Sequence, residues 1–386
     1  MKTRRMRRTL YIFVEVGARE LLSRLVLAEE ARSRGYRVVM GEKNLLRNLC
    51  WMFRAPQGII LDKCGQICRS YPMMALKRRG FRYVVLDEEG IFFSHSKRAP
   101  ESSDLMLFNS EYQRRLSKLP APSTDVVGNP RLHPEALLPY FEQEVRSIRE
   151  RYGEFVLICS SFDPKMTSSY GFAAEAELDA RYRELFLQVI ERLAQQQIPI
   201  VYRPHPSDGN EFAAQVARIV PVERRFTILP WITASKLVVN AKCTSSFEAV
   251  RLGVPSATLV VKSTTHAKLN ALSRRFYDVD SLCRYVEGGA YSVNLPRYKQ
   301  DYVALISGPE NPQAKLLDRL DAVEVPETGS FQFVEWAARV TRCVNSLWWG
   351  RASAEYIRAK YGSLTYADRF PGFTSHLGGH LLLSRD

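Results

Sequence analysis

The run Ile198-Pro-Ile-Val-Tyr202, followed by Arg203-Pro204-His205-Pro206, decides how this chain is interpreted. Its first five residues form the short apolar run that is typical of a buried strand. The prolines Pro204 and Pro206 then fix φ and stiffen the loop, which holds the His205 imidazole in one direction. A rigid turn with a solvated histidine is the alternative. Because ligands bind at the carboxyl ends of strands in open α/β sheets, we expect Arg203, His205 and Pro206 to line a ligand site.

A second strand end, after the run Lys236–Asn240, carries hydroxyl groups. Lys242-Cys-Thr244-Ser245-Ser246 leads into a helix that Gly253 closes, and Ser245 and Glu248 have capping-box spacing. A helix N-terminus with free N–H groups attracts phosphate, although the same pattern also describes a helix that is only well capped. No G-x-G-x-x-G or G-x-x-x-x-G-K-[ST] motif occurs, which disfavours ordinary dinucleotide and P-loop sites.

Three carboxylates follow the strand predicted at Phe81–Leu86, namely Asp87, Glu88 and Glu89. Carboxylates crowded at a strand end repel one another, which raises the pKa of at least one and suits a general acid or base. The alternative is a charged, solvated turn. Asp208, beyond the histidine loop, is a second candidate carboxylate, which could equally hold a ribose or cap the following helix.

Alternating strand and helix patterns along the chain predict parallel sheets in two Rossmann-like domains. We expect an N-terminal acceptor-side domain at 1–135, a nucleotide-sugar-binding domain at 150–330 and a C-terminal helical segment at 331–386. The strands of the second domain are expected near Phe155, Ile198, Phe226, Leu237 and Ala257. The fold class is α/β of GT-B type, with two sheets facing across a cleft and the last helix packing back across both domains.

The composition indicates a soluble globular protein with an anionic partner. The chain has 386 residues, of which 46% are hydrophobic and 25% charged, with a formal net charge of +14. No nucleic-acid module, signal peptide or membrane-spanning run is present in the sequence. We therefore expect a cytoplasmic protein, with the anionic inner membrane face as a further partner through its basic surface.

The sequence gives little reason to expect a metal. Its seven cysteines form no disulfide framework, and Cys64 and Cys68 have no second pair nearby, which disfavours zinc. Asp278-Val-Asp280 matches the D-x-D pattern of metal-dependent glycosyltransferases, but we interpret it as a turn into a helix. We expect no metal and no cofactor.

Several motifs, taken in order, resemble those of bacterial surface-carbohydrate biosynthesis proteins similar to the Kdo transferases of lipopolysaccharide and capsule assembly. Besides the three sites above, they are Glu15-Val-Gly-Ala-Arg-Glu20, Gly41-Glu-Lys-Asn44, Leu61-Asp-Lys63 and Val127-Gly-Asn-Pro130. More distantly, the carboxylate-Gly, His-Pro and Ser-Ser motifs look like those of bacterial GT-B sialyltransferases. Lys242 departs from this resemblance, because the family often has a polar or acidic residue there. It either adds a cation near the phosphate or marks an altered activity.

The resemblance implies a metal-independent glycosyltransferase that moves an acidic sugar from a CMP-activated donor to a glycan or glycolipid acceptor. It implies that His205 and Pro206 line the CMP site, that Ser245 and Ser246 bind its phosphate, and that the carboxylates at 87–89 face sugar and acceptor. The sequence leaves open whether the anomeric centre is retained or inverted. It also leaves open a UDP-sugar epimerase, a polyol-phosphate transferase of GT-B shape or a non-catalytic scaffold.

Overall fold

The chain forms two compact units in its computed structural model. The structure describes residues 8–15, 17–63, 70–88, 103–117, 124–160, 173–205, 210–241, 243–261, 272–292, 303, 308–325, 330–346, 373–376 and 381–384. Unit 1 contains Met1–His133 and Ala304–Asp386, and unit 2 contains Pro134–Val303. The sequence analysis assigned 304–330 to the second domain and 331–386 to a separate segment, whereas the structure groups both with unit 1.

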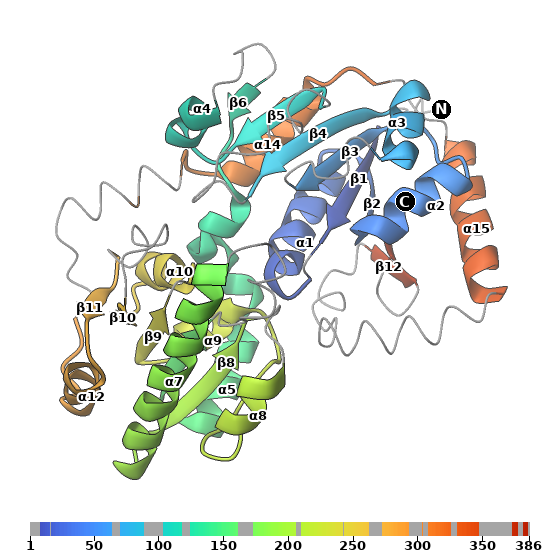
Figure 1. The fold of residues 1–386 in the computed structure, drawn as a ribbon. Coiled ribbons are helices and arrows are strands. Elements are labelled where there is room, and N and C mark those ends of the chain that lie inside the picture. The colour runs from blue at the N-terminus through green and yellow to red at the C-terminus, as the bar shows by residue number, and fades with distance from the viewer. Residues whose placement is uncertain are drawn as a thin grey trace. The chain divides into compact units, whose positions relative to one another are not determined.

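Six parallel strands form most of the unit 1 sheet, in the order β2-β1-β3-β4-β5-β6 (Figure 1). They are β1 (Thr9–Val14), β2 (Arg37–Glu42), β3 (Ile59–Lys63), β4 (Arg82–Asp87), β5 (Leu105–Phe108) and β6 (Thr124–Val126). Every residue of β1 and β3 is buried, as parallel strands covered on both faces require. The hairpin of β12 (Phe373–His376) and β13 (Leu381–Ser384), which the sequence did not predict, adds antiparallel to the edge strand β2.

Helices cover the unit 1 sheet. They are α1 (Gly17–Ser33), α2 (Lys43–Met52), α3 (Tyr71–Arg78), α4 (Glu111–Ser117), the 3-10 turn η2 (Pro130–Leu132), α14 (Pro312–Asp321) and α15 (Ser330–Ser346). Leu49 of α2, Leu76 of α3 and Trp336 of α15 share one apolar core with Tyr11 and Tyr83 of the sheet. The predicted last helix is therefore present, and its described buried side chains belong to the core of unit 1.

Unit 2 has a five-stranded parallel sheet in the order β11-β10-β9-β7-β8. Its strands are β7 (Val156–Ser160), β8 (Ile200–Pro204), β9 (Leu237–Ala241), β10 (Ser256–Leu259) and β11 (Arg274–Phe276). Its helices are η3 (Pro134–Tyr140), α5 (Glu142–Tyr152), α7 (Ala173–Gln195), α8 (Asn210–Val216), α9 (Ile228–Ala234), α10 (Ser245–Arg251) and α12 (Val279–Glu287). Tyr182 and Phe186 of α7 pack on Ile158 and Tyr202 of the sheet.

The prediction of a strand near Phe226 is wrong. Phe226 has φ of 62°, a left-handed conformation that interrupts a strand, and α9 begins two residues later. The Arg203 side chain holds this turn, since it donates hydrogen bonds to the carbonyl oxygens of Arg225 and Phe226. Within the described residues, no helix is long and apolar enough to cross a bilayer.

Candidate functional site

Charged side chains are buried at the carboxyl ends of the parallel strands of unit 1. Lys43 follows β2, Asp62 and Lys63 end β3, and Asp87 ends β4. All four are at most 3% exposed. Because burying a charge is costly without a partner, such residues must be paired. Strand ends of a parallel sheet meet at one edge, so these groups form one cluster, to which α1 contributes Glu20 and Arg24 from its first turns.

Glu20 and Lys63 form the centre of this cluster. Lys63 Nζ lies 2.9 Å from Glu20 Oε1 and 3.5 Å from Glu15 Oε2. The second Glu20 oxygen accepts a hydrogen bond of 2.9 Å from the Glu15 backbone N–H. Burial acts to raise the pKa of Glu20, but Lys63 and Arg24 outweigh it and hold the pKa below the ordinary value. Glu20 is therefore held as a carboxylate.

Asp62 is the second fully buried carboxylate of this cluster, and its pKa is shifted in the opposite direction from that of Glu20. Its Oδ1 lies 3.0 Å from Lys43 Nζ, and its Oδ2 accepts a short hydrogen bond from the Tyr83 hydroxyl. Burial raises the pKa of Asp62 above its ordinary value, although Lys43 and Tyr83 both act to lower it. The pKa values of the two buried carboxylates are thus moved in opposite directions.

Glu15 is the solvent-accessible carboxylate among the groups paired with Lys43 and Lys63. Its side chain is 34% exposed, whereas those of Glu20 and Asp62 are fully buried. Glu15 Oε2 lies 4.0 Å from Lys43 Nζ and is thus shared between the two lysines. A ligand at this edge of unit 1 would meet Glu15 before the two buried carboxylates.

The predicted cluster of mutually repelling carboxylates at 87–89 is not what the structure shows. Glu88 is 2% exposed, and its Oε1 lies 2.7 Å from Arg24 Nη2, so a cation neutralises it. The carbonyl oxygen of Glu88 also accepts a hydrogen bond of 3.4 Å from Arg131 Nη2. Asp87 is fully buried, and its carbonyl oxygen accepts a bond of 3.3 Å from Gln113 Nε2. Glu89 lies outside the described residues.

In unit 2, β8 brings Arg203 and His205 to the carboxyl edge of the sheet. The Arg203 guanidinium stacks on Trp231, with 5.8 Å between Cζ and the ring centroid, and binds the two carbonyl oxygens that form the Phe226 turn. It therefore has a structural role, and its predicted contact with phosphate stays a prediction. His205 is half-buried. Pro206 and Asp208 lie outside the described residues.

The hydroxyl-rich turn precedes α10, but the prediction of a capping box formed by Ser245 and Glu248 is wrong. The N-cap is Thr244, one residue before Ser245, and its side chain makes no capping hydrogen bond. Ser245 and Ser246 are buried in the first turn, where Ser246 Oγ donates to the Cys243 carbonyl at 3.0 Å. Ser245 lies inside the first turn and not at the N-cap, and its buried side chain neighbours the Cys159 thiol, whose pKa burial raises well above the ordinary value.

Glu248 also lies on the buried side of α10, with an exposure of 3%. Lys242 lies outside the described residues. The nucleotide-binding roles of Lys242, Thr244, Ser245, Ser246 and Glu248 stay predictions.

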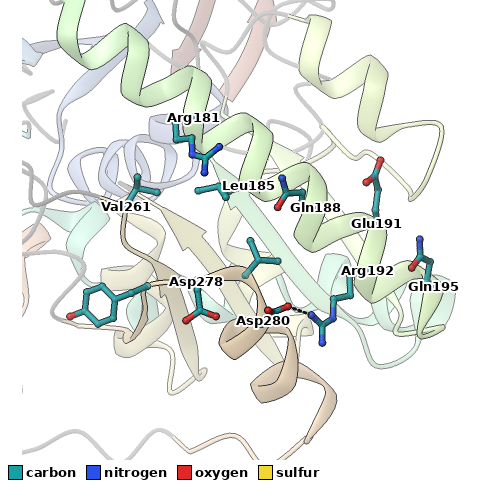
Figure 2. A pocket seen from close by; sticks show the side chains of 11 residues that line it. Arg181, Leu185, Gln188, Glu191, Arg192, Gln195, Val261, Asp278 and Asp280 are labelled. Atoms are coloured by element: carbon teal, nitrogen blue, oxygen red, sulfur yellow. Dashed lines mark hydrogen bonds and ion pairs between the residues drawn. The ribbon is translucent and has the colours of Figure 1, made fainter.

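The D-x-D tripeptide lies in a surface groove of about 610 Å³ between α7 and the start of α12 (Figure 2). Asp278 is the N-cap of α12 and accepts hydrogen bonds of 2.7 Å from the Ser281 N–H and hydroxyl. These bonds lower its pKa. Asp280 pairs with Arg192. The prediction of a turn into a helix is confirmed, and the described residues contain no cluster that could hold a metal ion.

The motifs at 15–20, 41–44 and 61–63 carry no predicted role from the sequence. The structure brings their charged residues together, with the pairs Lys43–Asp62 and Lys63–Glu20 at the centre. A signal was present in the sequence, because each motif places an acid or a lysine at the end of a buried run. The same reasoning that selected the residues at 87–89 applies to these motifs.

More than four fifths of the chain is similar in structure to UDP-N-acetylglucosamine 2-epimerases. A UDP-N-acetylglucosamine 2-epimerase from Rickettsia bellii aligns with a TM-score of 0.51 and 13% identity, covering 82% of this chain and 98% of that one. The Methanocaldococcus jannaschii UDP-GlcNAc 2-epimerase, solved with UDP-GlcNAc and UDP, gives 0.53 and 12%, covering 82% and 100%. A putative enzyme of this kind from Listeria monocytogenes gives 0.54 and 11%, covering 84% and 99%.

These similarities confirm the fold class, two Rossmann-like α/β domains of GT-B type with parallel sheets. No protein-family model matches the sequence, and no curated protein matches it either. The prediction of a CMP-sugar-dependent glycosyltransferase is wrong: the three similar structures named above are UDP-GlcNAc 2-epimerases, which act on a UDP-sugar. The resemblance to Kdo transferases has no support from the structural similarities.

Proposed function

We propose that this protein is a nucleotide-sugar enzyme that epimerises a UDP-sugar. Two findings support the proposal: the likeness to UDP-GlcNAc 2-epimerases over nearly their full length, and the paired carboxylates and lysines at the strand ends of unit 1. Inverting a sugar carbon by proton transfer breaks its C–H bond and forms a new one on the opposite face. That reaction needs one group that takes a proton and another that returns one.

The observation that carries the proposal is the position of the half-exposed Glu15 carboxylate within 4.0 Å of both Lys43 and Lys63. Each of these lysines also pairs with a buried carboxylate. In the proposed reaction Glu15 is the carboxylate that faces the sugar. Lys63 and Lys43, each held by a buried carboxylate, position it. Ligands for the UDP group are proposed on unit 2, from His205 and the backbone before α10. We propose that no metal or other resident cofactor takes part, so a chelator should leave turnover unchanged.

Nucleotide binding is the first test. A thermal shift with UDP, CDP and CMP should show the largest increase in melting temperature with UDP, because a ligand specific for the native state stabilises it. His205→Ala should weaken UDP binding without changing the melting temperature of the free protein. A larger shift with CMP than with UDP would contradict the proposed substrate class.

Turnover is the second test. UDP-GlcNAc incubated with the protein in D₂O should yield an epimer with deuterium at the inverted carbon, detected by NMR. Glu15→Gln should lower the rate by about 10²–10⁴-fold, the usual contribution of a general acid or base. Glu29→Gln is the matched control, because Glu29 lies on α1 of the same unit with a similar exposure of 35%.

Amide variants of Asp87 and Glu88 belong in the same assay, since both remain candidate carboxylates. If UDP raises the melting temperature but several UDP-sugars stay unchanged in D₂O, the protein is a nucleotide-sugar-binding scaffold, and the epimerase proposal fails.

A further inference from the structure

Helices α2 and α3 of unit 1 expose an apolar surface that the proposed reaction does not use. It consists of Trp51, Met52, Tyr71 and Met74, whose exposed fractions are 36%, 63%, 65% and 47%. We call it the α2–α3 patch. The Trp51 and Tyr71 rings meet edge to face, with centroids 5.6 Å apart, so the two helices form one continuous surface. Figure 1 shows the two helices in unit 1.

The α2–α3 patch is not the core-facing side of these two helices. The opposite sides of both helices already supply the core with Leu46, Leu49, Met73 and Leu76. Its apolar side chains are thus additional to those that folding needs. Exposed apolar groups that gather on one surface mark a binding site more often than scattered ones do.

Positive charge surrounds the patch. Arg54 and Arg78 are exposed beside it, and Arg47 lies on α2 one turn before Trp51. Between Lys43 and Arg82 the only acidic residue in the sequence is Asp62, which is fully buried. The exposed charges that this region itself supplies are therefore cationic, in a chain whose formal net charge is +14. One of them, Lys77 of α3, pairs with the half-exposed Asp104 at 3.6 Å, which leaves Arg54 and Arg78 as the charges beside the patch.

We propose that the α2–α3 patch binds the surface of an anionic lipid bilayer. Tryptophan and tyrosine favour the boundary between headgroups and acyl chains, where one end of the ring is apolar and the other is wet. Methionine adapts its shape to irregular apolar surroundings. Arginines around such groups are attracted to anionic headgroups. The four apolar side chains enter the boundary while Arg54 and Arg78 contact the headgroups.

Charge argues against a second copy of the chain as the occupant. A two-fold symmetric contact places the same surface on both partners. It would bring Arg54 and Arg78 of one copy close to the same cationic surface of the other, and the region Lys43–Arg82 supplies no exposed acid between them. Like charges brought together in this way oppose association. The proposal rests on this surface alone and is independent of the epimerase proposal.

Vesicle co-sedimentation tests the proposal. The protein should sediment with vesicles that contain phosphatidylglycerol and phosphatidylcholine, and less with phosphatidylcholine alone. Tyr71→Ser should lower the partition coefficient several-fold, whereas Tyr277→Ser, at an equally exposed tyrosine of unit 2 (68%), should not change it. Arg54→Glu combined with Arg78→Glu should lower it about tenfold or more, since two attractive charges become repulsive. Arg218→Glu, at an exposed arginine of unit 2, is the charge control.

A spectroscopic measurement does not depend on how well these variants fold. Brominated phosphatidylglycerol should quench part of the tryptophan fluorescence of the wild type, and Trp51→Phe should abolish that part while vesicle binding persists. Three results would overturn the proposal: no binding to anionic vesicles at low salt, equal losses in Tyr71→Ser and Tyr277→Ser, or a dimer in light scattering that Tyr71→Ser dissociates.

Discussion

Lys63 and Glu20 form a buried ion pair inside unit 1, with 2.9 Å between Nζ and Oε1. The pair joins the end of β3 to the first turns of α1. It therefore fixes the geometry of the strand-end edge where the proposed proton transfer takes place. The strength of this ion pair also determines the charges of Glu20 and Lys63 at this edge.

Replacing Lys63 by methionine should destabilise the protein by about 3–5 kcal/mol at neutral pH, because the variant leaves a buried carboxylate without its cation. The measurement is the free energy of unfolding in urea titrations. Arg32→Met, which breaks the half-exposed pair with Glu29, is the control and should cost no more than about 1 kcal/mol. Equal losses in the two variants would show that burial does not strengthen the Lys63 pair.

The pKa shifts of Glu20 and Asp62 predict opposite pH dependences. The pKa of Glu20 is lowered in the folded state, so its carboxylate stabilises the fold above the ordinary pKa of 4.5. That contribution is lost as the pH falls from 4.5 through the lower folded pKa. The pKa of Asp62 is raised, so its buried charge is relieved as the pH falls from that raised value toward the ordinary 3.8.

Urea titrations between pH 7 and pH 3 check both signs. The stability difference between the wild type and Glu20→Gln should shrink as the pH falls. The wild type should become more stable relative to Asp62→Asn as the pH falls from the raised pKa of Asp62 toward 3.8. Parallel curves for the two variants would mean that both carboxylates titrate alike in the folded state.

The sequence predicts those parts of the fold that depend on local pattern. Buried strands such as Leu10–Val14 are recognised from continuous apolar runs, and Asp278 from its position before a helix. The ion pairs could not be predicted, because they depend on β1 lying between β2 and β3 in the sheet order. The Phe226 turn could not be predicted for a similar reason. Its carbonyl oxygen accepts a hydrogen bond from Arg203, which lies on the separate strand β8.

Arg203→Lys separates a structural role from a binding role. Lysine keeps the charge but loses the planar donors that hold two carbonyl oxygens and the stacking on Trp231. We expect a loss of about 2–3 kcal/mol in the free energy of unfolding, in the range for hydrogen bonds from a charged donor. Affinity for UDP, measured by calorimetry below the melting temperature, should change less than tenfold. A larger loss of affinity with unchanged stability would make Arg203 a phosphate ligand, as the sequence suggested.

Gly308 and Gly253 have nearly the same backbone conformation, with φ of 72° and 70°, but very different surroundings. A Cβ at Gly253 would meet nothing within 4 Å, whereas one at Gly308 would overlap the carbonyl oxygen of Asn109 at the end of β5. Gly253→Ala should therefore cost only the left-handed conformation, about 1 kcal/mol. Gly308→Ala should add the cost of moving backbone apart, for a total of about 3 kcal/mol or more. Thermal melts of the two variants compare them directly, and a melting temperature for Gly308→Ala equal to that of Gly253→Ala would show that the approach to Asn109 is not close.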